Sequence, residues 1–228
     1  DDRVVALNYL RADYHRTGGF SHNAIANGQV VYIRYSSFSS SASSSQLNYV
    51  LNRYPEAKGV VLDLRQNGGG SVENIWNILR LFAPEGEAPL LYHTQLKNGP
   101  DHNDFTPLEE VYAPENTTSY DTYTKPVVVL TDRGCYSATS FFALSCRAYP
   151  NITTVGDTTG GGLGIPNGGQ LPNGWYYRFS ITRTLDPQGN NYENGVPPEV
   201  QLLLDPQSTA NGRDNLIDYA VELILSGK

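Results

Sequence analysis

The sequence predicts a mixed α/β fold built on a mostly parallel β-sheet with helical crossovers. Short apolar runs are typical of strands covered on both faces, and they predict strands at residues 29–35, 59–65 and 125–132. Apolar residues at helical spacing follow each run, at residues 46–54, 72–82 and 137–148. Strands and helices that alternate at such short spacing indicate parallel neighbours joined by crossover helices.

The remaining elements follow from local composition. Residues 36–45 contain eight serines and predict a flexible polar loop. Residues 84–124 predict irregular structure with one strand near 89–95. A fourth strand at 151–157 leads into a glycine-dense loop and a hairpin around 174–185. The aromatic residues of this hairpin are expected in the core, with a substrate cleft as the alternative. Asp214 is expected to cap a closing helix.

Composition excludes several classes of protein. The chain has 228 residues, a length that suits one large domain, and a net charge of −7. This acidic balance, with no Lys/Arg cluster, argues against a nucleic-acid partner. No apolar stretch approaches the ~20 residues that a membrane-spanning helix needs. Cys135 and Cys146 match no metal motif, so we expect free, packed thiols, with a disulfide between them as the alternative. Neither a metal nor a cofactor is predicted.

Three glycines, Gly68 to Gly70, lie between a predicted strand and the next helix. One interpretation is a turn in which glycine supplies positive φ. The other is a loop whose N–H groups line an anion-accepting pocket at a helix N-terminus. The motifs of dinucleotide-binding loops and P-loops are both missing, so the residues alone leave the two interpretations open.

Ser137 lies where the strand at 125–132 gives way to a helix. A serine in this place is a normal N-cap. It is equally where a tight turn would expose a nucleophilic hydroxyl, with the next N–H as an oxyanion donor. Context is needed to decide between the cap and the nucleophile.

Four blocks supply that context: "GVVLDLRQNGGG", "KPVVVLTDRGCYSATSFFA", "TVGDTTGGGLG" and "YENGVPPEV". In order and spacing they resemble the tail-specific, or C-terminal processing, serine peptidases, over roughly residues 29–226. The resemblance implies a spiral α/β fold like that of the ClpP and crotonase enzymes. It also implies a serine endopeptidase that acts on peptide or protein substrates, without a metal and mostly outside the cytoplasm.

The resemblance also implies roles for individual residues. In the tail-specific branch a lysine about 25 residues after the serine is the base, but here that place falls at Gly162, and the one later lysine is Lys228. The chain therefore looks like the branch of the tricorn protease core, in which a histidine activates the serine. Residue matching makes Ser137 the nucleophile, Glu193 the supporting carboxylate, and the N–H groups of Gly70 and Ala138 the oxyanion hole. Apart from this match, Glu193 is an ordinary exposed turn residue.

The base histidine is missing from its expected setting. All four histidines precede Ser137: His15, His22, His93 and His102. None lies in the "Asp-Gly-His" type of stretch that the tricorn-like branch carries upstream of its first core strand. His22 is the possible base within this sequence, while His93 and His102 are expected to be solvated or structural.

The chain also begins without methionine and without the pattern of a signal peptide. We therefore expect residues 1–28 to be an N-terminal extension left from an upstream region that held the base, and residues 29–228 to be the peptidase catalytic domain. Two alternatives stay open: a non-catalytic module that binds an apolar ligand or peptide, as in the retinoid-binding proteins of this fold, and a crotonase-like acyl-CoA enzyme.

Overall fold

A computed structural model describes residues 20–39, 44–83, 86, 88–115 and 121–227. Its central sheet has six strands in the order β1-β2-β3-β6-β7-β11. Only the edge strand β1 pairs antiparallel; the other pairs are parallel. The strands are β1 (Phe20–Ile25), β2 (Val30–Tyr35), β3 (Gly59–Asp63), β6 (Val127–Thr131), β7 (Ile152–Gly156) and β11 (Val200–Gln201). The predicted α/β class with a mostly parallel sheet is confirmed, and the closer ClpP/crotonase-like spiral stays a prediction.

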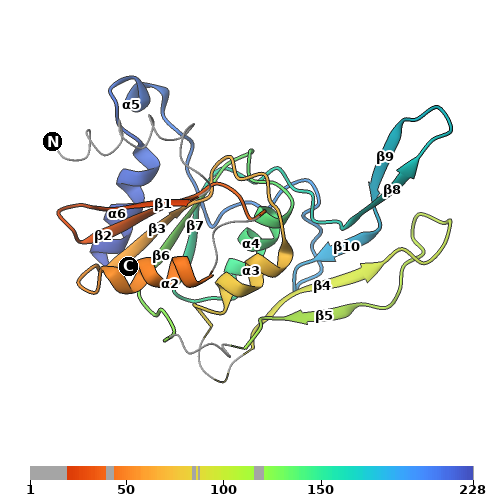
Figure 1. Ribbon diagram of the computed structural model, residues 1–228, viewed down its shortest axis with the longest axis horizontal. Coiled ribbons are helices and arrows are strands. Elements are labelled where there is room, and N and C mark those ends of the chain that lie inside the picture. The colour runs from red at the N-terminus through yellow and green to blue at the C-terminus, as the bar shows by residue number, and fades with distance from the viewer. Residues whose placement is uncertain (1–19, 40–43, 84–85, 87, 116–120, 228) are drawn as a thin grey trace.

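Helices cover both faces of this sheet (Figure 1). Successive strand residues point to opposite faces, so alternate side chains of β2, β3 and β6 enter two separate cores. One core contains side chains of α2 (Ser44–Arg53), α3 (Val72–Leu79) and α4 (Ala138–Cys146). The other contains side chains of α6 (Asn215–Ser226). These helices match the predicted ones, and Asp214 caps α6 as predicted by accepting the N–H groups of Leu216 and Ile217.

Two smaller sheets extend from the side of the molecule opposite α6 (Figure 1). One has the order β10-β4-β5, and the other is a hairpin of β8 and β9. Their bounds are β4 (Leu90–Leu96), β5 (Glu109–Tyr112), β8 (Pro166–Gln170), β9 (Tyr176–Ser180) and β10 (Thr182–Leu185). A short helix, α5 (Pro206–Ala210), precedes α6. The strand predicted near 89–95 is confirmed, whereas β5 was not expected. The predicted hairpin exists but spans residues 166–180 rather than 174–185, because β9 pairs with β8 while β10 pairs with β4.

Two sequence predictions are wrong. Phe38, in the serine-rich segment, is only 1% exposed and packs between the rings of Tyr35 and Phe142, so this part of the loop belongs to the core. The hairpin aromatics are not core: Trp175 is 71% and Tyr176 80% exposed, because the hairpin extends away from both cores. Cys135 and Cys146 are buried and free, as predicted.

Residues 20–25, which the sequence assigns to an N-terminal extension, form β1 and pair along their whole length with β2. They are therefore structurally part of the central sheet. The functional boundary at residue 29 stays a prediction.

Candidate active site

The carboxyl ends of β3 and β6 lie side by side, because these strands are parallel neighbours in the sheet. β3 is followed by the glycine loop, residues 65–71, and β6 by the serine turn, residues 132–137. Crevices at the carboxyl ends of parallel strands are the usual ligand sites of open α/β sheets. The two sequence motifs that carry the predicted chemistry therefore meet at one edge of the sheet.

Asn67 holds the glycine loop against its surroundings. This side chain is fully buried; its Nδ2 donates to the Tyr35 carbonyl at 3.0 Å, and its Oδ1 accepts the Gly69 N–H at 3.0 Å. Its backbone carbonyl accepts the Tyr136 N–H at 3.1 Å, which ties the glycine loop directly to the serine turn.

Gly70 lies in a parallel bridge with Phe38. Phe38 donates to the Gly69 carbonyl at 2.9 Å and accepts the Ser71 N–H at 3.1 Å. In this pattern the N–H of the bridged residue points away from its partner. Within the described residues, the Gly70 N–H has no hydrogen-bond acceptor. The same holds for the Ala138 N–H at the start of α4. Neither amide is therefore paired within this part of the chain.

Ser137 has an unusual backbone. Its φ of 55° and ψ of −120° are costly for a residue with a side chain. It occupies the N-cap position of α4, but its side chain makes no capping hydrogen bond. The residue is half-buried, and its N–H donates to the Gly161 carbonyl at 2.8 Å. The structure thus shows a strained turn whose serine side chain makes no capping bond to the helix.

Gly69 makes close contact with this turn. A Cβ at Gly69 would lie 2.9 Å from the Ala138 nitrogen and 3.0 Å from the Ser137 Cβ. Two groups that approach so closely require a residue without a side chain. The glycine loop and the serine turn are therefore in direct contact.

Glu193 reaches the same region through its backbone. Its carbonyl accepts the Gly162 N–H at 2.8 Å, one residue from the Gly161 carbonyl that Ser137 binds. Its carboxylate accepts the Ser180 hydroxyl at 3.1 Å. Within the described residues, no hydrogen bond joins the Glu193 carboxylate to Ser137.

The place where the tail-specific branch has its lysine is filled differently. A Cβ at Gly162 would lie 2.4 Å from the Tyr136 ring, and Gly162 has a φ of 76°. The ring of Tyr136 therefore occupies the space that a side chain at Gly162 would need.

The structure does not bring a described histidine to Ser137. The His22 ring lies on β1, where its Nδ1 is 3.2 Å from the Tyr54 hydroxyl. Burial, and then the charge of Arg53, lower the pKa of His22. His93 is half-buried on β4 and His102 is exposed, with neither in hydrogen-bond contact with Ser137. His15 lies outside the described residues.

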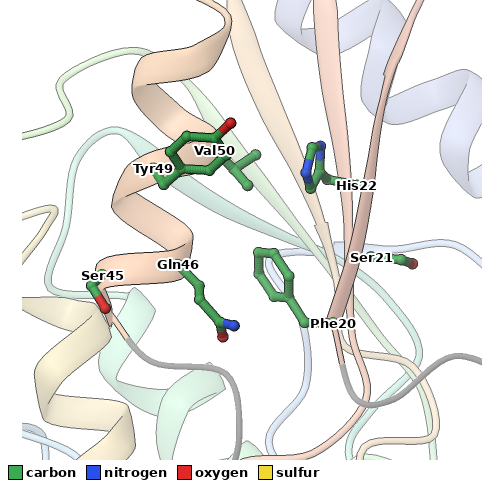
Figure 2. A pocket seen from close by; sticks show the side chains of 7 residues that line it. All are labelled: Phe20, Ser21, His22, Ser45, Gln46, Tyr49 and Val50. Atoms are coloured by element: carbon green, nitrogen blue, oxygen red, sulfur yellow. The ribbon is translucent and has the colours of Figure 1, made fainter.

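His22 lines a cavity of about 520 Å³ between β1 and α2 (Figure 2). The other lining residues are Phe20, Ser21, Ser45, Gln46, Tyr49 and Val50. None of them belongs to the glycine loop or the serine turn. Ring contacts of Phe20 with Tyr35 and of Tyr35 with Phe38 fill the core between this cavity and the bridge at Gly70.

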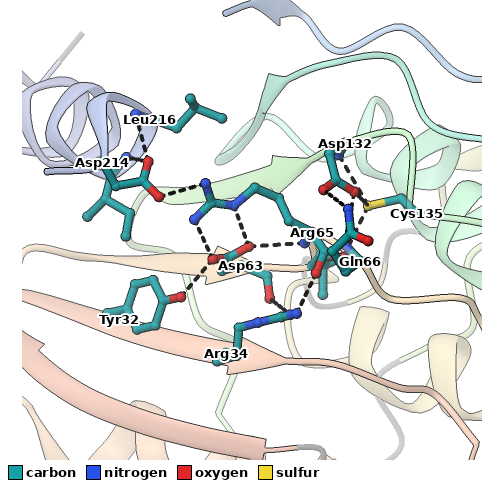
Figure 3. Close-up of polar contacts among 11 residues, drawn as sticks. Tyr32, Arg34, Asp63, Arg65, Gln66, Asp132, Cys135, Asp214 and Leu216 are labelled. Atoms are coloured by element: carbon teal, nitrogen blue, oxygen red, sulfur yellow. Dashed lines mark hydrogen bonds and ion pairs between the residues drawn. The ribbon is translucent and has the colours of Figure 1, made fainter. Parts of the chain in front are cut away.

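A buried ionic network lies where the glycine loop leaves β3 (Figure 3). Arg65 forms two hydrogen bonds to the Asp63 carboxylate, at 2.9 and 2.7 Å, and a third to Asp214 at 2.7 Å. The Tyr32 hydroxyl donates to Asp63 at 2.6 Å. Burial raises the pKa of Asp63, but Arg65, then Arg34 and the Tyr32 hydroxyl, outweigh burial and hold it at about 2. The network thus connects the end of β3 to the cap of α6.

Removing the Tyr32 hydroxyl is expected to destabilise the fold by about 2 kcal/mol at pH 7, as losing a hydrogen bond to a buried charge does. The lowered pKa of Asp63 means that its carboxylate stabilises the fold above pH 4, and that this stabilisation is lost as the pH falls toward about 2. The penalty of Tyr32→Phe should therefore shrink over that range. Urea unfolding at pH 7 and pH 3 measures both effects.

Tyr149 provides a matched control. It is 2% exposed, and its hydroxyl has no hydrogen-bond partner among the described residues. Tyr149→Phe should leave the free energy of unfolding unchanged or raise it slightly. Equal losses for the two variants would show that the Tyr32–Asp63 hydrogen bond contributes nothing beyond packing.

Sequence reasoning missed Gln66, Asn67 and Asp132, which join the glycine loop to its neighbours. The available signal was their position, since all three follow the ends of buried strands.

No group of three or more His, Cys, Asp or Glu side chains in the described part of the chain could hold a metal ion. Among the helices of the described residues, none has both the length and the apolar character needed to cross a membrane.

Comparison with known proteins identifies the family. Residues 29–202 match the model of "Peptidase family S41". The carboxy-terminal processing protease CtpA of Bacillus subtilis is 28% identical over 149 residues, which cover 65% of this chain and 29% of that protein. The chain thus spans less than a third of the length of this relative.

Solved structures of similar proteins agree with this family match. The crystal structure of a peptidase from Parabacteroides merdae, described there as putative, superposes with a TM-score of 0.87 at 37% identity, over 99% of this chain and 70% of that one. The tricorn protease matches with a TM-score of 0.53 at 20% identity, over 88% of this chain and 18% of that one, a likeness of fold alone. With its family match over most of its length, the chain belongs to peptidase family S41.

Proposed function

We propose that this chain is the catalytic core of a serine endopeptidase of the Ser-His-Glu type. The observation that carries the proposal is Ser137, held at a φ of 55° without a capping bond, against a glycine loop. Strained backbone of this kind is found at functional sites, where the surroundings maintain it. The Gly70 and Ala138 amides lack acceptors among the described residues and would form the oxyanion hole.

The reaction follows from these positions. The Ser137 Oγ attacks the scissile carbonyl carbon while its proton passes to a base. The carbonyl oxygen becomes an oxyanion that accepts hydrogen bonds from the Gly70 and Ala138 amides. The C–N bond then breaks, the amine leaves with the proton, and water hydrolyses the acyl-enzyme to release Ser137. Glu193 would orient the base, a role that its position beside Gly162 supports.

The base is proposed to be a histidine outside the described residues. His22 has the lowered pKa that a neutral base needs, but its ring contacts are with Phe20 and Tyr54 on the far side of the Tyr35–Phe38 pair. His22 would become the base only if the β1 edge moved. A segment upstream of β1 is the better source, because it enters the sheet at Phe20, opposite Tyr35 at the carboxyl end of β2.

Peptide or protein chains are the proposed substrates, as for the peptidases of the family. A location outside the cytoplasm is proposed on the earlier resemblance alone.

A biotinylated fluorophosphonate tests the function, because its phosphorus is attacked by an activated serine with loss of fluoride. Ser137 is expected to be labelled in the wild-type protein, and Ser137→Ala should abolish the label, as peptide mapping would show. His15→Gln and His22→Gln would identify the base by the loss of labelling rate. Absence of any label on the full-length protein would favour the alternative, a non-catalytic module that binds an apolar ligand or peptide.

A further inference from the structure

The two proposed oxyanion donors come from different loops. The Gly70 amide belongs to the glycine loop after β3, and the Ala138 amide follows the serine turn after β6. Two amides stabilise one oxygen only when both lie within about 3 Å of it. Sheet pairing ends at Asp63 and Leu130, several residues before either donor. Contacts between the loops must therefore set the separation of the donors.

Gln66 and Asp132 join these loops by two hydrogen bonds. The Gln66 N–H donates to Asp132 Oδ1 at 2.9 Å, and its side-chain Nε2 donates to Asp132 Oδ2 at 2.5 Å. Asp132 Oδ1 also accepts the Gly134 N–H at 2.9 Å, within the serine turn itself. One carboxylate thus binds the backbone of both loops.

Backbone strain marks the same pair of loops. In the described residues, the non-glycine residues with positive φ are Ala26, Asn27, Gln66 and Ser137. Ala26 and Asn27 form the β1–β2 turn, where positive φ is ordinary. Gln66, with a φ of 62°, and Ser137, with a φ of 55°, lie in the two loops of the candidate site. Such conformations persist only where neighbouring contacts hold them.

Gly134 lies where the serine turn approaches the glycine loop closely around Gln66, with no room for a side chain. A Cβ at this position would lie 2.7 Å from the Gln66 side-chain amide and 2.8 Å from the Gln66 Cα. Gly134 is not at positive φ, so conformation does not require glycine there. The absence of a side chain is needed because Gln66 packs directly on the serine turn.

The exposure of the Gln66–Asp132 pair means that its loss can change the position of a loop without a large change in the free energy of unfolding. Gln66 is exposed and Asp132 half-buried. Exposed polar pairs contribute little to the free energy of unfolding. Their loss can nevertheless displace a loop, and displacements of about 1 Å are enough to impair catalysis.

We propose that Gln66 and Asp132 are positioning residues that set the distance between the Gly70 and Ala138 amides. The inference rests on the proposed peptidase function. It predicts that breaking the pair lowers kcat, because the oxyanion is bound less well in the transition state. KM and thermal stability should stay nearly unchanged, since neither residue is proposed to contact the substrate and the pair is exposed.

Exchange of the two functional groups is the test. Gln66→Glu places two carboxylates against each other, and Asp132→Ala removes both acceptor oxygens, so each single variant loses the side-chain bond. The double variant Gln66→Glu/Asp132→Asn restores it with the donor reversed, and the amide oxygen introduced at position 132 can still accept the backbone N–H groups. Gln201→Met is the matched control, because it breaks a similar exposed amide–carboxylate bond, 3.0 Å long, between Gln201 and Asp157.

Hydrolysis of fluorescein-labelled casein and the rate of fluorophosphonate labelling give two readouts. Each single variant should lose about 10- to 100-fold in kcat. This loss is no larger than the loss in kcat that follows removal of one oxyanion donor. KM should stay within about twofold, and the double variant should recover most of the rate. Gln201→Met should match the wild type.

Three outcomes overturn the inference. Single variants with wild-type kcat show that the pair positions nothing. A loss of kcat that follows a loss of Tm shows a merely structural role, as does a double variant that recovers Tm without kcat. In each case Ser137→Ala must be inactive; if it hydrolyses casein like the wild type, the proposed function has failed instead.

Discussion

Ser137→Ala is expected to lower kcat/KM for peptide hydrolysis by about four orders of magnitude or more, the loss that follows removal of a serine nucleophile. The fold should keep its stability, because the hydroxyl makes no capping bond to α4. Ser137→Gly should be equally inactive but more stable. Glycine adopts a φ of 55° and a ψ of −120° without the cost that a Cβ brings. We expect a gain of about 1 kcal/mol over Ser137→Ala, or roughly 2–4 °C in Tm.

Ser71 supplies the matched control for stability. It also occupies an N-cap position without a side-chain capping bond, but its φ of −81° is ordinary. Ser71→Gly should therefore lower the free energy of unfolding, by the extra entropy that glycine gives the unfolded chain. Casein hydrolysis and urea unfolding measure the two effects. If Ser137→Gly proves less stable than Ser137→Ala, the backbone at Ser137 is not strained.

The central sheet could be predicted because its inner strands carry a strong signal. Every residue of β3 and β6 is buried, and each strand appears in the sequence as a nearly continuous apolar run. The edge strand β1 has no such run. All six of its residues are half-buried, and it includes Ser21, His22 and Asn23, so its pairing with β2 leaves no clear pattern in the sequence.

Composition misled in opposite directions at two places. Eight serines concealed one core side chain, Phe38, whose burial depends on the bridge to Gly70 far along the chain. Four aromatics in the hairpin suggested a core, yet Trp175, Tyr176, Tyr177 and Phe179 are each at least 45% exposed. Burial is a property of the tertiary arrangement, and local composition reports only its average.

One part of the candidate site could be predicted from the sequence, and another part could not. That the loop of Gly68 to Gly70 should meet Ser137 is implied by the family resemblance. The pairing of β3 with β6 and the close contact of Gly69 with the serine turn agree with it. The contact between Gln66 and Asp132 could not be predicted, because it depends on a positive φ at Gln66 that no residue preference indicates. Loop conformations of this kind are set by contacts between segments distant in sequence.

The second large effect is expected at Gly70. A Cβ there would lie 2.3 Å from the backbone of Phe38 and Ser39, and the φ of 145° disfavours any side chain. Gly70→Ala must therefore break the bridge to Phe38 and turn the Gly70 N–H away from its position. We expect a loss of about 100- to 1,000-fold in kcat, the loss that follows removal of one oxyanion donor. Stability should fall by about 1–3 kcal/mol through backbone strain.

Gly68→Ala provides the comparison within the same triplet. A Cβ at Gly68 meets no atom within 4 Å, and Gly68 is not at positive φ. This variant should hydrolyse casein within about threefold of the wild-type rate, since only an adjacent loop position changes. Initial rates of casein hydrolysis and urea unfolding measure the loss of activity and of stability in both variants. Similar losses at Gly68 and Gly70 would mean that the triplet acts as a flexible turn, whereas a loss confined to Gly70 would mean that the loop presents one particular amide.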